Sequence, residues 1–212
     1  MARISSAIGG VTVCVNGPVV DPYSGINLPA AGEYELDGWE ALAFLRTRHG
    51  VGDGSDLGRI SNQQVFMSAL VRSLKADGVL NDFGKLYNIA TVSAQNLTVS
   101  NSLKNVNTMI SMAQVLKTLP LDRVLFVQYP GTTGKPGVYS GKVAPIQYAA
   151  DALFAKIRAD EPFVLAAGNT GSGSVANPNA PTDVAESTTE GVEVLEGVKG
   201  QSAADYTCSN AN

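Results

Sequence analysis

The stretch LDGWEALAFLRTRHGVGDGSDLGRISNQQVFMSALVRSL, residues 36–74, decides how this chain is interpreted. It places Arg46, Arg48 and Arg59 close together between long apolar runs. The chain as a whole is acidic, with a formal net charge of −4, so this local gathering of guanidinium groups indicates an anionic partner. Arginine suits phosphate because its planar fork donates two parallel hydrogen bonds and does not lose its proton.

The backbone around the first two arginines decides whether they can act together. On a continuous helix, Arg46 and Arg48 would point ~200° apart and could not share one anion. We therefore predict a helix from Gly38 to about Phe44 and an extended chain from Leu45 onward. In an extended chain the side chains alternate, which places both arginines on one face.

A second helix is expected after the loop HGVGDGSDLG, with Ser55 or Asp56 as its N-cap. Arg59 and Gln63 are one turn apart on that helix, so they share a face. The helix N-terminus adds unpaired N–H donors and partial positive charge. Together with the two extended arginines, this arrangement would suit a lipid phosphate beside an apolar surface.

An ordinary alternative is that the arginines form surface ion pairs, because acidic residues are close in sequence: Glu33, Glu35, Asp53 and Asp56. His49 is interpreted as a loop residue rather than a base, since no nucleophile motif accompanies it. No multi-histidine metal site is possible with one histidine, and we predict no metal ligands in this chain.

The run LDGWEALAFLRTRH followed by GSDLGRISNQQ resembles the signature of the LytR-CpsA-Psr family of cell-envelope phosphotransferases. The upstream run IGGVTVCVNGPVVDPYSG and the downstream run DRVLFVQYPG are similar to the actinobacterial type of this family. The resemblance covers about residues 4–162, with several motifs in the right order.

The resemblance implies an α/β fold, with a mixed central sheet flanked by helices and a long apolar pocket for a polyprenyl chain. It implies transfer of a glycopolymer, such as teichoic acid or arabinogalactan, from a polyprenyl-pyrophosphate carrier to peptidoglycan. The family uses Mg²⁺ and acts outside the cytoplasm, at the cell membrane or cell wall. The expected partners are therefore the lipid-linked glycopolymer in the membrane and the peptidoglycan acceptor.

The resemblance also assigns residues. Arg46 and Arg48 match the R-x-R pair that contacts the pyrophosphate, and they are the predicted catalytic residues. Arg59 and Gln63 match the arginine and glutamine of the run D-x-x-R-x-x-R-Q-Q, as further pyrophosphate ligands. Asn62 stands where that run has its second arginine, which puts one phosphate contact in question.

Part of the family pattern has no counterpart here. The aspartate that holds Mg²⁺, its paired arginine and the membrane anchor lie upstream of anything that resembles Ile4. We therefore expect residues 1–163 to be a C-terminal portion of the domain, with the Mg²⁺ ligands upstream of this chain. The alternative function is a truncated, non-catalytic envelope fragment that binds polyprenyl phosphate or glycan.

Composition restricts the class of protein. A pI of about 5.0 without a basic stripe argues against nucleic-acid binding. No apolar run reaches the ~18 residues of a membrane span, and the N-terminus lacks a signal-peptide pattern. Cys14 and Cys208 are the only cysteines, and they are compatible with either a disulfide or two thiols.

The chain beyond residue 163 differs in composition from the rest. From Ala166 to about Glu190 it is rich in Gly, Ser, Asn, Thr and Pro, which cannot bury enough apolar surface to offset the entropy of ordering. We predict that residues 164–212 form a low-complexity, mostly disordered tail. Before it, Val11–Val15 and Val124–Val127 are predicted strands, the second buried on both faces.

Overall fold

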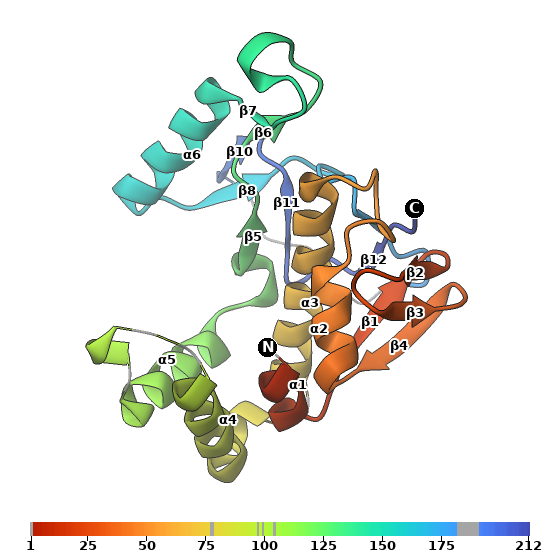
Figure 1. Ribbon diagram of the computed structural model, residues 1–212. Coiled ribbons are helices and arrows are strands. Elements are labelled where there is room, and N and C mark those ends of the chain that lie inside the picture. The colour runs from red at the N-terminus through yellow and green to blue at the C-terminus, as the bar shows by residue number, and fades with distance from the viewer. Residues whose placement is uncertain (1, 77–78, 97, 99, 104, 182–190) are drawn as a thin grey trace.

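The computed structural model describes residues 2–76, 79–96, 98, 100–103, 105–181 and 191–212 (Figure 1). Its largest sheet has four strands in the order β4 (Gly32–Leu36), β1 (Val11–Val15), β12 (Thr207–Ser209) and β9 (Ser174–Ala176). The β1–β12 pair is parallel, and the two outer pairs are antiparallel. The predicted mixed sheet with flanking helices is confirmed.

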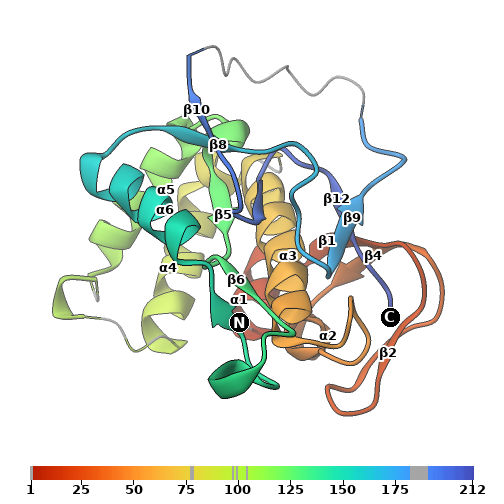
Figure 2. The same cartoon turned by 90° about the horizontal axis from the view of Figure 1, so that it is seen from above.

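Alternation along β1 shows which face of the sheet carries the core. Val11, Val13 and Val15 are buried, whereas Thr12 between them is exposed. The buried face is covered by α2 (Gly38–Arg46) and the long α3 (Asp56–Ala76), with the short α1 (Ala2–Ile8) beside them (Figures 1 and 2). The first of these helices begins at Gly38, as predicted, and the Asp37 carboxylate caps it by accepting a hydrogen bond from the Gly38 N–H.

The remaining elements surround this centre. A hairpin of β2 (Val19–Asp21) and β3 (Ile26–Leu28) leads into β4, and the helices α4 (Phe83–Asn96) and α5 (Val106–Thr118) follow α3. Single-turn helices lie at Val79–Asn81, Asn101–Leu103, Leu121–Arg123 and Gly137–Tyr139. The later elements are β5 (Leu125–Val127), β6 (Gly131–Thr132), β7 (Ala144–Pro145), α6 (Gln147–Ala159), β8 (Phe163–Leu165), β10 (Glu193–Leu195) and β11 (Gly200–Ser202).

A second, smaller core forms under α6. Ala149 and Leu153 of this helix pack against Leu195 and Val198, beside the parallel pair β8–β10. The neighbouring strand β5 pairs only with β11 among the described residues, and its side chains are half-buried. The prediction of a strand buried on both faces is therefore wrong, because a two-stranded ladder leaves one face uncovered.

The segment after residue 163 contributes to both cores. It supplies β12 between β1 and β9, and Cys208 of β12 is joined to Cys14 of β1 by a disulfide. The predicted disorder is wrong for residues 164–181 and 191–212, and the part of that prediction on residues 182–190 lies outside the described residues. Composition misled here because these short strands obtain their hydrogen-bonding partners from segments distant in sequence: β12 pairs with β1, and β11 pairs with β5.

Among the described residues, no helix is both long and apolar enough to span a membrane.

Candidate functional site

The end of α2 carries the first two predicted site residues. The helix continues to Arg46, and the backbone becomes extended at Thr47, with φ −59° and ψ 139°. The predicted change at Leu45 is thus two residues too early, because Leu45 is still packed in the core and holds the last turn in place. Thr47 is buried, whereas Arg46 and Arg48 on either side of it are exposed, so both arginines do reach solvent.

The last carbonyl groups of α2 are bound by side chains of α3. The amide nitrogen of Asn62 donates to the Phe44 carbonyl at 2.9 Å, and that of Gln63 donates to the Leu45 carbonyl at 3.0 Å. Helix ends leave such carbonyls without partners, so these two amides anchor the end of α2 that carries Arg46.

These contacts change the interpretation of both amides. Asn62 is completely buried, and its oxygen accepts a hydrogen bond from the Ser209 hydroxyl. It therefore replaces the family's arginine with a structural residue rather than with a weaker phosphate ligand. Gln63 uses one of its two N–H donors on the backbone, which leaves one for a ligand.

The three arginines differ in their partners. Arg59 pairs with Asp56 one turn earlier, at 3.0 Å, so the ion-pair alternative holds for this residue. The Nε of Arg48 donates to the Gly54 carbonyl at 2.8 Å, which fixes the side chain without neutralising its charge. The side chain of Arg46 makes no hydrogen bond or ion pair with another described residue. Two of the three positive charges are therefore available to an anion.

The loop between α2 and α3 ends at the predicted cap. The Ser55 hydroxyl accepts a hydrogen bond from the Gly58 N–H at 3.1 Å, and the Asp53 carboxylate accepts bonds from the Ser55 and Ser172 hydroxyls. The hydrogen bond from Ser55 lowers the pKa of Asp53, against the opposing effect of burial. Asp53 is thus engaged within the loop and does not face the arginines as a counter-ion.

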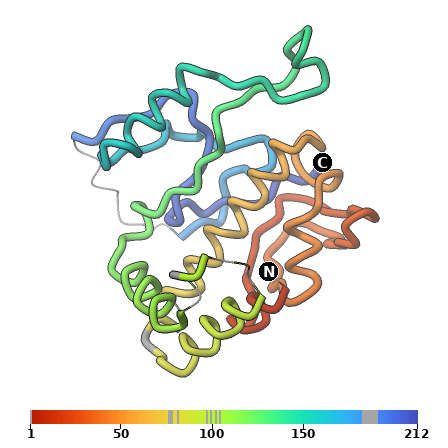
Figure 3. The backbone as a smooth tube through the Cα atoms, turned by 60° about the vertical axis from the view of Figure 1, so that its left-hand side comes forward, coloured from red at the N-terminus to blue at the C-terminus, as the bar shows by residue number. Residues whose placement is uncertain are grey.

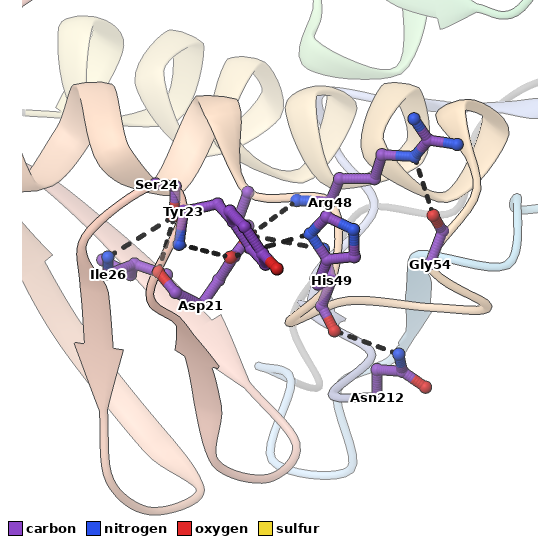
Figure 4. A network of polar contacts seen from close by, with 9 residues as sticks. Asp21, Tyr23, Ser24, Ile26, Arg48, His49, Gly54 and Asn212 are labelled. Carbon is purple, nitrogen blue, oxygen red and sulfur yellow. Dashed lines mark hydrogen bonds and ion pairs between the residues drawn. The ribbon is translucent and has the colours of Figure 1, made fainter.

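Sequence reasoning missed Asp21, a buried carboxylate at the end of β2 (Figure 4). One of its oxygens accepts bonds from the Thr47 hydroxyl at 2.8 Å, the Arg48 N–H at 3.1 Å and the His49 N–H at 3.3 Å. The other oxygen accepts the Tyr23 N–H at 3.0 Å. Burial raises the pKa of Asp21, but these four hydrogen bonds outweigh it, so the pKa lies below its usual range.

The last residues of the chain close over the same loop. The Gly52 N–H donates to the Asn210 carbonyl at 2.7 Å, and the Asn212 N–H donates to the Gly50 carbonyl at 3.2 Å. The side chain of Asn212 also donates to the His49 carbonyl at 3.0 Å (Figure 4). The arginine loop, residues 47–55, is therefore held by β2 on one side and by residues 210–212 on the other.

Residues 171–173 also pack directly against the first turn of α3. A Cβ at Gly173 would lie only 2.0 Å from the Gly58 carbonyl oxygen, and one at Gly171 only 2.2 Å from the Ser61 hydroxyl. A side chain at residue 173 would meet the backbone of Gly58, and one at residue 171 would meet the Ser61 side chain, so glycine suits both positions. This contact links the C-terminal half of the chain to the helix that carries Arg59.

An apolar groove of about 270 Å³ lies between α4 and α5, at the far end of α3 from the arginine loop (Figures 1 and 3). Its lining includes Leu86, Ala90, Met109, Ile110 and Met112. We expected the apolar faces of the Arg59 helix and its neighbours to line the lipid pocket. On the Arg59 helix itself, Val65, Phe66 and Ala69 are buried in the core and do not line this groove.

The acidic residues of the described parts do not form a cation site. No group of three or more His, Cys, Asp or Glu side chains is arranged to hold a metal ion among these residues. Asp21 and Asp53 are each occupied by several donors from the protein. The described residues therefore do not fit Mg²⁺.

Comparison with known proteins places this geometry in a family. The sequence profile of the LytR_cpsA_psr family matches residues 1–154, which include the arginine loop and both helices beside it. The chain belongs to this family. The match ends before β8, so the C-terminal strands that complete the central sheet lie outside it.

Two relatives come from Corynebacterium glutamicum. The chain is 35% identical over 130 residues to the cell wall biosynthesis protein LcpA, which covers 61% of this chain and 24% of LcpA. It is 37% identical over 80 residues to the probable cell wall biosynthesis protein LcpB, covering 38% of this chain and 19% of that protein. The chain thus spans about a quarter or less of the length of these relatives.

Two solved structures are similar to this chain. The crystal structure of TagV from B. subtilis matches with a TM-score of 0.55 at 19% identity, over 74% of this chain and 58% of TagV. The LytR-Csp2A-Psr enzyme from Actinomyces oris matches with a TM-score of 0.47 at 25% identity, over 73% of this chain and 59% of that chain.

Proposed function

We propose that this chain provides the pyrophosphate-binding face of a cell-wall transferase. The reaction is the transfer of a glycopolymer from a polyprenyl-pyrophosphate carrier to peptidoglycan. Membership of the LytR-CpsA-Psr family and the similarity to two cell wall biosynthesis proteins support this proposal. The disulfide between Cys14 and Cys208 is in keeping with a location outside the cytoplasm, at the membrane or cell wall.

The observation that carries the proposal is the state of Arg46 and Arg48. Both side chains are exposed, neither is paired with a carboxylate among the described residues, and Thr47 between them is held by a buried hydrogen bond to Asp21. Donors held in place before a ligand arrives lose little free energy in reorganising when negative charge develops. Such a pair suits the diphosphate of a lipid carrier better than it suits a structural role.

In the proposed reaction, an acceptor hydroxyl attacks the phosphorus that bears the glycopolymer. The bond to the bridging oxygen breaks, and polyprenyl phosphate leaves with the additional negative charge. Arg46 and Arg48 neutralise that charge as it develops, with Arg59 and Gln63 as further ligands. The divalent cation expected for the family would be held by residues outside the described part of the chain.

The proposal is tested by binding of a short-chain polyprenyl pyrophosphate to the purified chain, measured by calorimetry. Arg46→Ala and Arg48→Ala should each weaken binding at least tenfold, because each removes a charge-assisted hydrogen bond to the ligand. Arg158→Ala, which changes an exposed arginine on α6, is the matched control and should bind like the parent. Circular dichroism should be unchanged in all three variants. Unaltered binding by the first two would refute the assignment.

The alternative is an envelope fragment that binds the same lipid phosphate without turnover. The lack of an acidic cluster among the described residues favours it, since transfer in this family requires a cation. The two functions separate when transfer to peptidoglycan is assayed with the chain alone and again with an upstream segment supplied. Turnover by the chain alone would eliminate the fragment.

A further inference from the structure

The imidazole of His49 lies between a buried carboxylate and solvent. Its Nδ1 is 3.8 Å from the Oδ1 of Asp21, and its ring packs against the ring of Tyr23 with 4.8 Å between centroids. The side chain of His49 is 58% exposed, whereas that of Asp21 is 2% exposed. One edge of the ring therefore faces fixed negative charge, and the remainder is open to a ligand.

Asp21 holds both the imidazole ring of His49 and the backbone of the arginine loop. Asp21 accepts the main-chain N–H groups of Arg48 and His49, so the backbone that carries the imidazole is held as well as the ring itself. Figure 4 shows the second ring nitrogen directed away from Asp21, toward the side on which the Arg48 side chain extends. An anion bound by Arg48 would thus meet this nitrogen as a second donor.

The charges around the ring predict how its protonation responds to such an anion. The groups that contact it are the Asp21 carboxylate from β2 and the Tyr23 ring from the following turn, while the neighbouring Arg48 side chain is directed to the Gly54 carbonyl. A phosphate on Arg48 would add a second negative charge near the ring, and nearby negative charge favours a protonated imidazole.

From this geometry we infer that His49 is a further ligand of the phosphate group bound at Arg48, that binding takes up a proton on its ring, and that Asp21 is the positioning residue for both. This inference rests on the proposed function and adds a proton-linked ligand to its site. Linkage requires reciprocity: if protonation strengthens anion binding, then anion binding must strengthen protonation by the same factor.

The test uses the fact that His49 is the only histidine in the chain. Its ring C–H signals in a proton NMR spectrum can therefore be followed without ambiguity from about pH 5 to about pH 9. The titration is run without ligand, with inorganic pyrophosphate and with sulfate. Sulfate keeps its charge throughout this range, so any change that it causes arises from the protein. We expect both anions to raise the midpoint of the His49 titration by about half to one pH unit.

Two variants locate the effect. His49→Gln keeps a neutral donor of similar size, so sulfate affinity should no longer rise as the pH falls, while binding above about pH 8 should stay within about twofold of the parent. Asp21→Asn removes the residue that positions the ring and the loop, and should reduce the change in the His49 midpoint that an anion causes. If circular dichroism shows that Asp21→Asn does not fold, the titration of the parent chain and the sulfate affinity of His49→Gln still test the inference.

The outcomes separate this inference from the proposed function. Arg48-dependent binding without a change in the His49 midpoint overturns the inference and leaves the proposed function standing. A midpoint that shifts equally in Arg48→Ala also overturns it, because the anion would then bind elsewhere. If pyrophosphate does not bind the parent chain at millimolar concentration, both proposals fail.

Discussion

The two ends of α3 differ in how they are built. At its N-terminal end, the arginine loop is held by a buried carboxylate, two buried or half-buried amides and residues 210–212. At its C-terminal end, α4 and α5 enclose an apolar groove on whose rim Met112 is largely exposed. An anion is bound best by hydrogen-bond donors that are held in place before it arrives. An apolar group is bound by apolar surface from which water is released. One helix therefore connects a rigid polar region with an adaptable apolar one.

The largest expected effect comes from removing the disulfide, which joins residues 194 positions apart close to the arginine loop. Cys14→Ser with Cys208→Ser should lower the free energy of unfolding by about 3–5 kcal/mol, because the unfolded chain loses its longest constraint. Urea unfolding measures the loss. Hydrogen exchange should accelerate in residues 49–52 and remain unchanged in α4 and α5. Equal acceleration in residues 49–52 and in α4 and α5 would show that the two ends of α3 do not differ in rigidity.

The next effect concerns the buried amide that joins α3 to α2. Asn62→Ala leaves the Phe44 carbonyl and the Ser209 hydroxyl without their partners, which should cost about 2–3 kcal/mol of unfolding free energy. Asn96→Ala at the other end of the molecule removes a hydrogen bond from an exposed asparagine to the Val92 carbonyl. That control should change stability by less than about 0.5 kcal/mol. Similar losses in the two variants would contradict the difference in rigidity.

The arginine-loop end should also be the more sensitive to acid. The folded-state pKa of Asp21 is lowered, so its contribution to stability is present above the pKa of the unfolded chain, near about pH 4, and is lost as the pH falls through the folded value. The free energy of unfolding of the parent should therefore decline more steeply below about pH 4 than that of Asp21→Asn. Parallel pH profiles would show that the carboxylate is not engaged in the folded protein.

The smallest effect on stability is expected at the surface ion pair between Arg59 and Asp56. Asp56→Asn should change the free energy of unfolding by no more than about 0.5 kcal/mol, since both side chains are substantially exposed. It should strengthen sulfate binding severalfold, because Arg59 then has no carboxylate beside it. Weaker binding in this variant would indicate that the pair itself positions Arg59 for the ligand.

Structural features that depend on residues close in sequence could be predicted. The strand Val11–Val15, the Ser55 cap and the helices α2 and α3 follow from apolar spacing and capping residues, and the structure confirms them. The family signature pointed to Arg46 and Arg48, whose role in binding stays a prediction. The helix that carries Arg46 continues two residues further than predicted because Leu45 belongs to the core.

Structural features that depend on residues far apart in sequence could not be predicted. The three-residue strands β9 to β12 obtain their partners from elsewhere in the chain, so their polar composition suggested disorder. Asp21 acts through N–H groups more than twenty residues later, which no local pattern reports. One signal was present: alternation in β2 turns Val19 and Asp21 to the same buried side, and a carboxylate there requires donors.

The position of β12 has a consequence for biosynthesis. The strand that pairs with β1 leaves the ribosome 194 residues after it, so the inner edge of β1 stays unpaired while the residues between them are made. A strand edge that stays unpaired for this long favours slow folding and intermolecular pairing. The arginine loop, which is held by residues 210–212, is likewise completed only after those residues have been made.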